Sequence, residues 1–184
     1  MQQYYTLNVA GLSRELPLCP VSDKLDIAAF IMFSDVEMTV ACAEALLKVV
    51  PEFDVILTAE AKGIPLAYEM SRQSGKLYIP ARKAEKLYMS DPVIVEDESI
   101  TTNGKQKLVI DRKDLDAMNG KRVLIVDDVI STGASLEALE QLVLSAGGTV
   151  VGKMAVLAEG DAINREDVIA LAPLPLFDKD GKAL

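Results

Sequence analysis

The sequence predicts an α/β protein built on a doubly wound, mainly parallel sheet, with one hairpin that leaves the sheet. Two strand–helix–strand crossovers and one hairpin signal indicate this fold class. Parallel strands joined by helical crossovers form sheets that carry helices on both faces. Because no repeat or long linker interrupts the 184 residues, we expect a single domain over residues 1–184. About residues 1–33 and 173–184 have the least regular pattern and are expected to form elements that cover the sheet.

The first crossover begins with a helix. The capping-box sequence Ser34-Asp35-Val36-Glu37 starts this helix, and Pro51 ends it. The elements that follow are a buried strand at residues 55–58, a helix at residues 64–72 and a strand at residues 77–79. This order predicts one βαβ unit.

The second crossover has the clearer pattern. Residues 123–126 form an apolar, mostly β-branched run, which is typical of a strand buried on both faces. Residues 136–146 have a helical pattern, Gly147-Gly148 ends that helix, and residues 150–157 return as a strand. A second βαβ unit is therefore expected.

A hairpin is expected between the two crossovers. Asn103-Gly104, flanked by residues 100–102 and 106–110, is a strong signal for a tight turn. Near the chain end, Pro173 and Pro175 argue against a central strand, because proline cannot donate a ladder hydrogen bond.

Composition excludes several function classes. The sequence has no histidine and only two cysteines, which excludes the usual zinc sites and any mechanism that needs an imidazole. A formal charge of −9 argues against binding to nucleic acid. We expect no membrane segment and a cytoplasmic location, because no apolar run is long enough to span a bilayer and the first residues lack a signal-peptide pattern.

Residues 123–135 carry the most specific chemistry. The strand delivers Asp127 and Asp128 to the carboxyl edge of the sheet, where open α/β folds bind ligands. Residues 131–135 then supply hydroxyls, a glycine and backbone N–H groups at a helix start, a nest that holds phosphate. Carboxylates beside it suit sugar hydroxyls and Mg²⁺. The plain alternative is a strand and a capped helix with two exposed carboxylates.

This stretch resembles the phosphoribosyl pyrophosphate signature of the type I phosphoribosyltransferases. The resemblance implies that Asp127 and Asp128 are catalytic, face the ribose hydroxyls and hold Mg²⁺ directly or through water. The implied substrate-binding residues are Val129, Ile130, Ser131, Thr132, Gly133, Ala134 and Ser135. A response-regulator receiver also has paired aspartates, but that pair follows its first strand, and only 56 residues follow Asp128 here.

The loop after residues 55–58 resembles the pyrophosphate loop of the adenine and xanthine transferases. By this resemblance Glu60, Ala61 and Gly63 bind substrate. Lys62 is implied to be catalytic, and it stands where the adenine enzymes usually carry an arginine with its two-pronged geometry. The resemblance also implies a non-proline cis peptide near Ala61-Lys62, a bond that persists only where its surroundings hold it.

A basic stretch follows the next strand. Arg82, Lys83 and Lys86 resemble an Arg-Lys-x-x-Lys-Leu sequence of the same enzymes, which implies a catalytic role for Arg82 and substrate binding by the two lysines. Together they would concentrate positive charge for a pyrophosphate leaving group. A solvated basic loop is the alternative.

Two further regions are implied by the resemblance alone. The hairpin would carry a mobile loop over about residues 91–104, with Glu96, Glu98 and Ser99 as polar candidates, unless this stretch is only an exposed acidic hairpin. The resemblance also implies a small hood from about residues 1–33 and 173–184, in which Phe30 or Phe33 would stack on a purine unless both belong to the core.

The implied function is that of a purine phosphoribosyltransferase. It would use Mg²⁺ to transfer ribose 5-phosphate from phosphoribosyl pyrophosphate to a purine base in nucleotide salvage, with adenine favoured and xanthine or guanine next. A homodimer is expected. The alternative is a non-catalytic regulator that senses phosphoribosyl pyrophosphate or a purine, and the intact aspartate pair and phosphate loop favour the enzyme.

Overall fold

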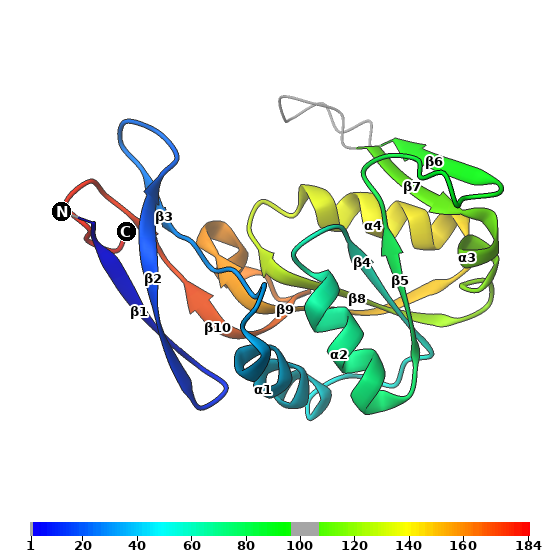
Figure 1. Ribbon diagram of the computed structural model, residues 1–184, viewed down its shortest axis with the longest axis horizontal. Helices are drawn as coiled ribbons and strands as arrows, with labels where there is room; N and C mark the ends of the chain where they lie inside the picture. Colours follow the sequence, from blue (N-terminus) through cyan, green and yellow to red (C-terminus); the bar gives the residue numbers. More distant parts are fainter. Residues whose placement is uncertain (1, 97–106) are drawn as a thin grey trace.

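The central sheet has five strands in the order β10-β9-β8-β4-β5, and every pairing in it is parallel. The computed structural model describes residues 2–96 and 107–184, arranged as Figure 1 shows. The strands of this sheet are β4 (Val55–Ala59), β5 (Leu77–Ala81), β8 (Arg122–Ile130), β9 (Thr149–Glu159) and β10 (Ile169–Leu174). The predicted doubly wound α/β class is therefore confirmed.

Helices cover both faces of this sheet (Figure 1). One face is covered by α1 (Val36–Leu47) and α2 (Ile64–Ser74). The other is covered by α4 (Ala134–Ser145), the hairpin of β6 (Pro92–Glu96) and β7 (Lys107–Asp111), and α3 (Arg112–Asp116). Successive side chains of β8 alternate between the two cores, Leu124 and Val126 on one side and Val123 and Ile125 on the other.

The chain leaves β4 and β8 in opposite directions. From β4 it passes through α2 to β5, and from β8 it passes through α4 to β9 on the other side of the sheet. Because β4 and β8 are neighbours, the point where the order reverses lies between them. The carboxyl ends of the strands at such a switch point form the usual ligand crevice of open α/β sheets.

A second sheet, which we call the hood sheet, lies at one end of the molecule (Figure 1). It is antiparallel, with the order β1-β2-β3-β11, and its strands are β1 (Tyr4–Val9), β2 (Leu12–Pro20), β3 (Asp26–Ala28) and β11 (Leu176–Phe177). Ala10 and Gly11 join β1 to β2 with φ angles of 52° and 78°, the two positive values that a tight hairpin turn requires. Leu7 and Leu18 pack in the same core as α1.

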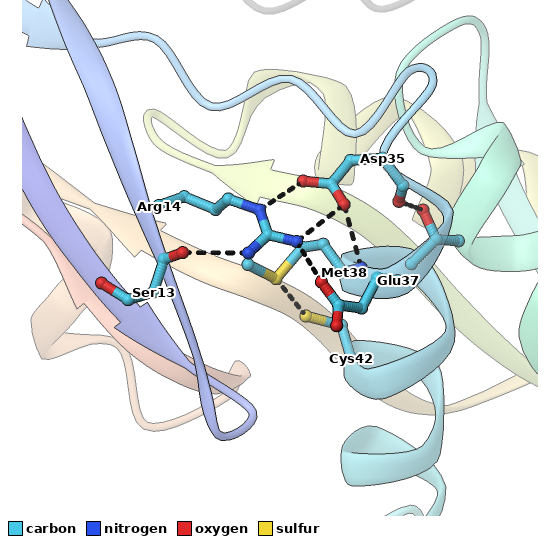
Figure 2. Close-up of polar contacts among 7 residues, drawn as sticks. Ser13, Arg14, Asp35, Glu37, Met38 and Cys42 are labelled. Carbon is cyan, nitrogen blue, oxygen red and sulfur yellow. Dashed lines mark hydrogen bonds and ion pairs between the residues drawn. The ribbon is translucent and has the colours of Figure 1, made fainter.

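An arginine of the hood sheet binds the start of α1 (Figure 2). Arg14 donates from Nε and Nη2 to Asp35 at 2.8 and 3.1 Å, and from Nη2 to Glu37 at 2.7 Å. The prediction of Ser34 as the helix cap is wrong, because Asp35 accepts the Met38 N–H at 3.1 Å while Glu37 turns to Arg14 and does not close a capping box. The Arg14 guanidinium holds the pKa of Asp35 below its usual value.

Other differences concern the hairpin and the chain end. The described hairpin strands are Pro92–Glu96 and Lys107–Asp111, while the predicted strand at residues 100–102 and the predicted turn at Asn103-Gly104 lie outside the described residues. Pro173 lies in β10, an edge strand, as proline in a strand requires. Phe30 is buried in the core, whereas Phe33 is half exposed. Among the described residues, no helix has the length and apolar character to cross a membrane.

Candidate functional site

The candidate site lies at the switch point, where the loops after β4 and β8 meet. A cavity of about 600 Å³ opens there. It is lined by Ala59, Glu60, Ala61, Lys62, Lys83, Lys107, Leu108, Asp127, Asp128, Val129 and Ser135. Two stretches that were singled out separately in the sequence, residues 60–63 and 127–135, therefore share one cavity.

The acidic pair forms the floor of this cavity. Asp128 is 2% exposed, and its backbone N–H donates to Asp127 Oδ1 at 2.9 Å. Lys62 Nζ lies 3.3 Å from Asp128 Oδ2, yet this buried oxygen accepts no hydrogen bond from the described residues, so the contact with Lys62 is electrostatic. Burial, and then the charge of Asp128, raises the pKa of Asp127 to about 7 although Lys62 opposes the shift.

Gly63 brings the two loops into contact. A Cβ atom at this position would lie 2.4 Å from Thr58 Oγ1 and 2.7 Å from Asp127 Oδ1, far inside van der Waals contact. Both neighbours are buried or partly buried on adjacent strands and have little room to move. The close approach of the loop to Asp127 therefore requires glycine.

The loop itself contains the expected kind of peptide bond. A non-proline cis peptide joins Glu60 and Ala61, one bond before the position expected near Ala61-Lys62. The Glu60 N–H donates to the Ala81 carbonyl at 2.8 Å, which ties the loop to the end of β5.

The basic stretch after β5 gathers around Glu60. Arg82 Nε donates to Glu60 Oε2 at 2.7 Å, the Lys83 N–H donates to the other oxygen, and Lys86 Nζ lies 3.7 Å away. Although burial opposes them, these donors and charges hold the pKa of Glu60 below its usual value. Lys83 lines the cavity, while Arg82 and Lys86 contact it through Glu60.

The loop of residues 131–135 begins where β8 ends. Gly133 caps α4 with a φ of +85°, a conformation that favours glycine. A smaller hollow of about 60 Å³ lies on this loop, and Asp127, Val129 and Ser135 line both cavities. The lining of the smaller hollow also includes Ile130, Ser131 and Thr132. Ala134 is the first residue of α4, so this loop leads directly into the start of a helix, as the sequence predicted.

The hairpin contributes to the cavity from the side of β7. Lys107 and Leu108 line the cavity, and Val109 exchanges backbone hydrogen bonds of 2.7 and 2.8 Å with Arg82. Glu96 is the last residue of β6, while Glu98 and Ser99 lie outside the described residues.

Sequence reasoning did not single out Lys107 or Glu159. Glu159 ends β9, the strand beside β8, and burial raises its pKa, as does the charge of Asp128, while Lys62 lowers it. A carboxylate at the end of a neighbouring parallel strand is the same signal that identified the aspartate pair, so Glu159 was within reach of the sequence. Lys107 had no comparable signal, because only the folding back of the hairpin brings it to the cavity.

The fold is that of a doubly wound α/β protein with its candidate site at the switch point. Comparison with known proteins gives the family, since the family model described as "Phosphoribosyl transferase domain" matches residues 37–170. The chain belongs to this family, and the resemblance noted at residues 123–135 is confirmed.

Proteins of similar sequence and structure support this family assignment. The chain is 33% identical over 143 residues to the adenine phosphoribosyltransferase of Rhodococcus jostii, covering 78% of each chain. It is 32% identical over 191 aligned residues to that of Salinispora tropica, covering 96% of this chain and 97% of the relative. The crystal structure of adenine phosphoribosyltransferase from Thermoanaerobacter pseudethanolicus matches with a TM-score of 0.65 at 28% identity, over 77% of this chain and 84% of that one.

Proposed function

We propose that the protein transfers ribose 5-phosphate from phosphoribosyl pyrophosphate to a purine base, with adenine favoured over xanthine and guanine, and releases pyrophosphate. The observation that carries this proposal is the meeting of the β4 and β8 loops around one cavity of about 600 Å³. The relatives above, which are named for adenine, support adenine as the base.

The loops after β4 and β8 would bind opposite ends of phosphoribosyl pyrophosphate. In this proposal residues 131–135 bind the 5′-phosphate through backbone N–H groups, and Asp127 and Asp128 accept hydrogen bonds from the ribose hydroxyls. Lys62, with Lys83 and Lys107 on the same cavity, would stabilise the negative charge that grows on pyrophosphate as its bond to the sugar breaks. Arg82 and Lys86 would position Glu60 and add to the positive charge.

The donor set fits Mg²⁺. Asp128 Oδ2 is a buried carboxylate oxygen without a hydrogen bond from the described residues, and Mg²⁺ prefers such hard oxygen donors. No group of three or more His, Cys, Asp or Glu side chains suited to a metal occurs among the described residues, which suits an ion that completes its shell with water and substrate phosphates. We propose that Asp127 and Asp128 hold it directly or through water. When bound, Mg²⁺ would supply positive charge to the pyrophosphate.

A homodimer in the cytoplasm also remains a proposal. Apolar side chains are exposed on neighbouring surfaces of α1 and α2, at Val36, Val40 and Tyr68, which a second copy of the chain would cover. Light scattering coupled to size-exclusion chromatography measures the mass directly, and a monomer at micromolar concentration would contradict the dimer.

The function is tested by incubating the protein with phosphoribosyl pyrophosphate, Mg²⁺ and one base at a time, and measuring nucleotide and pyrophosphate. We expect AMP with adenine. Turnover only with xanthine or guanine would show that the preferred base is not adenine. Binding of phosphoribosyl pyrophosphate without turnover on any base would contradict the proposed enzymatic activity. The relatives named above give the regulatory alternative no support.

A further inference from the structure

Arg165 lies against residues 131–135, which we call the phosphate loop. It belongs to the connection between β9 and β10, where the sequence shows no motif. It follows the short helix η1 (Gly160–Asn164), beyond the end of β9. Its Nη1 atom lies 2.3 Å from the point where a Cβ atom of Gly133 would be, and its Cζ atom lies 3.5 Å from the same point. The guanidinium is therefore packed on the glycine that caps α4.

The rest of the guanidinium is held by an acidic side chain. Arg165 donates from Nε and Nη2 to the two oxygens of Asp167 at 2.9 and 2.7 Å. Nη1 makes no hydrogen bond with any described residue. The nitrogen that packs on Gly133 is thus the one that remains available to a ligand.

Asp167 is held in turn by the sheet and by α4. Lys153 of β9 lies 2.5 Å from Asp167 and 2.6 Å from Glu140 of α4, and its side chain is only 15% exposed. A chain of ion pairs therefore fixes Arg165 relative to the helix that carries the phosphate loop. Such preorganisation lowers the entropy lost when a ligand binds.

The phosphate loop has no full positive charge of its own. Residues 131–135 carry no charged side chain, and the carboxylates of Asp127 and Asp128 lie just before them in a chain of charge −9. Backbone N–H groups and the helix dipole supply only partial charges. A guanidinium at Gly133 offsets the repulsion between the acidic pair and an incoming phosphate dianion.

We propose that Arg165 is a further binding residue for the 5′-phosphate of the substrate, and that Asp167 positions it. This inference rests on the proposed function, which supplies the phosphorylated sugar. It assigns to the β9–β10 connection a role in binding the end of the substrate that is far from the leaving group.

The test compares two ligands that use different loops. Ribose 5-phosphate carries only the 5′-phosphate, while pyrophosphate would bind the loop of residues 60–63. In the Arg165→Gln variant we expect the affinity for ribose 5-phosphate, measured by calorimetry, to fall on the order of 10- to 100-fold. We expect the affinity for pyrophosphate with Mg²⁺ to stay within about twofold, and KM for phosphoribosyl pyrophosphate to rise more than kcat falls.

Arg122→Gln is the matched control. Arg122 donates to both oxygens of Asp54, as Arg165 does to those of Asp167, but Arg122 is the first residue of β8 and so lies at the amino end of that strand, away from the candidate site. Its loss should leave both affinities unchanged. Arg165→Lys keeps the charge without the fork, so it should restore part of the affinity and serves as the test if the glutamine variant folds poorly.

Two outcomes would overturn the inference. Unchanged affinity of folded Arg165→Gln for ribose 5-phosphate, or an equal loss for both ligands, would show that Arg165 does not bind the 5′-phosphate. Neither result would affect the proposed function. If the wild-type protein bound neither phosphoribosyl pyrophosphate nor ribose 5-phosphate, the proposed function would fail and the inference with it.

Discussion

The candidate site and the hood sheet are assembled in different ways. At the site, short loops directly follow β4 and β8, two strands that pair in register from Val55 with Val123 onward. In the hood sheet, β11 pairs with β3 from the opposite end of the sequence, and the Tyr5 and Phe177 rings lie 5.2 Å apart. The first arrangement repeats a local pattern, whereas the second depends on contacts between distant residues. Changes in one region should therefore leave the other intact.

The largest effect is expected from the acidic pair. Asp127→Asn combined with Asp128→Asn removes the carboxylates from the cavity floor while their size and packing are kept. We expect the rate of nucleotide formation to fall on the order of 10³-fold, as for other preorganised charge-stabilising groups, with the circular dichroism spectrum unchanged. Wild-type turnover in the folded double variant would contradict the assignment of the site.

The second largest loss of rate is expected when one methyl group is added at Gly63. Gly63→Ala places a Cβ atom against Thr58 and Asp127, so the loop of residues 60–63 must move away from the acidic pair. A displacement of about 1 Å costs on the order of 10² in rate. The control is Gly120→Ala, where φ is +67° but nothing lies within 4 Å of the new atom. It should lower the melting temperature and leave the rate unchanged, and equal losses of rate would argue against a steric cause.

The pH dependence of stability tests the charge on Asp127 without substrate. Because the folded-state pKa of about 7 lies above the ordinary aspartate value, the folded protein retains a proton that the unfolded chain has lost in the window from about pH 4 to pH 7. The contribution of Asp127 to the stability of the metal-free protein therefore falls as pH rises through this window. Asp127→Asn cannot titrate, so its advantage in melting temperature over wild type should be larger at pH 8 than at pH 5. An equal difference at both values would contradict the raised pKa.

The smallest effect is expected from the link between the two regions. Arg14→Met removes the ion pairs that join the hood sheet to α1 (Figure 2). We expect the melting temperature to fall by at most a few degrees, with one unfolding transition and kcat unchanged, since partly exposed ion pairs contribute little. Arg112→Met, which removes an exposed pair with Asp91, is the control. Loss of kcat would show that the candidate site depends on the hood sheet, and two separate unfolding transitions would show that the two regions unfold independently once the ion pairs are lost. Either result would contradict the expected outcome.

Prediction from the sequence failed where contacts between distant residues decided the local structure. The capping-box pattern at Ser34 is locally valid, but Arg14 from another strand takes Glu37, and Asp35 becomes the cap. The strand β10 contains Pro173 near its end, with Pro175 just beyond it, and gave no strand signal of its own. It forms because it pairs with β9 at the edge of the sheet. The β4, α2, β5, β8 and β9 elements were predicted, since each combines an apolar run with a clear terminator.

The sequence by itself determined the class of fold and the family, and it located the two loops that line the cavity. Each loop follows its strand directly along the chain. Its pattern of strand end, glycine and polar residues can therefore be recognised without knowledge of the packing. Only the tertiary structure decided that Gly63 contacts Asp127, that Lys107 reaches the cavity and that Arg165 packs on Gly133. These contacts join residues that are far apart in sequence, and their distances depend on how sheets, helices and hairpin pack together, which no local pattern encodes.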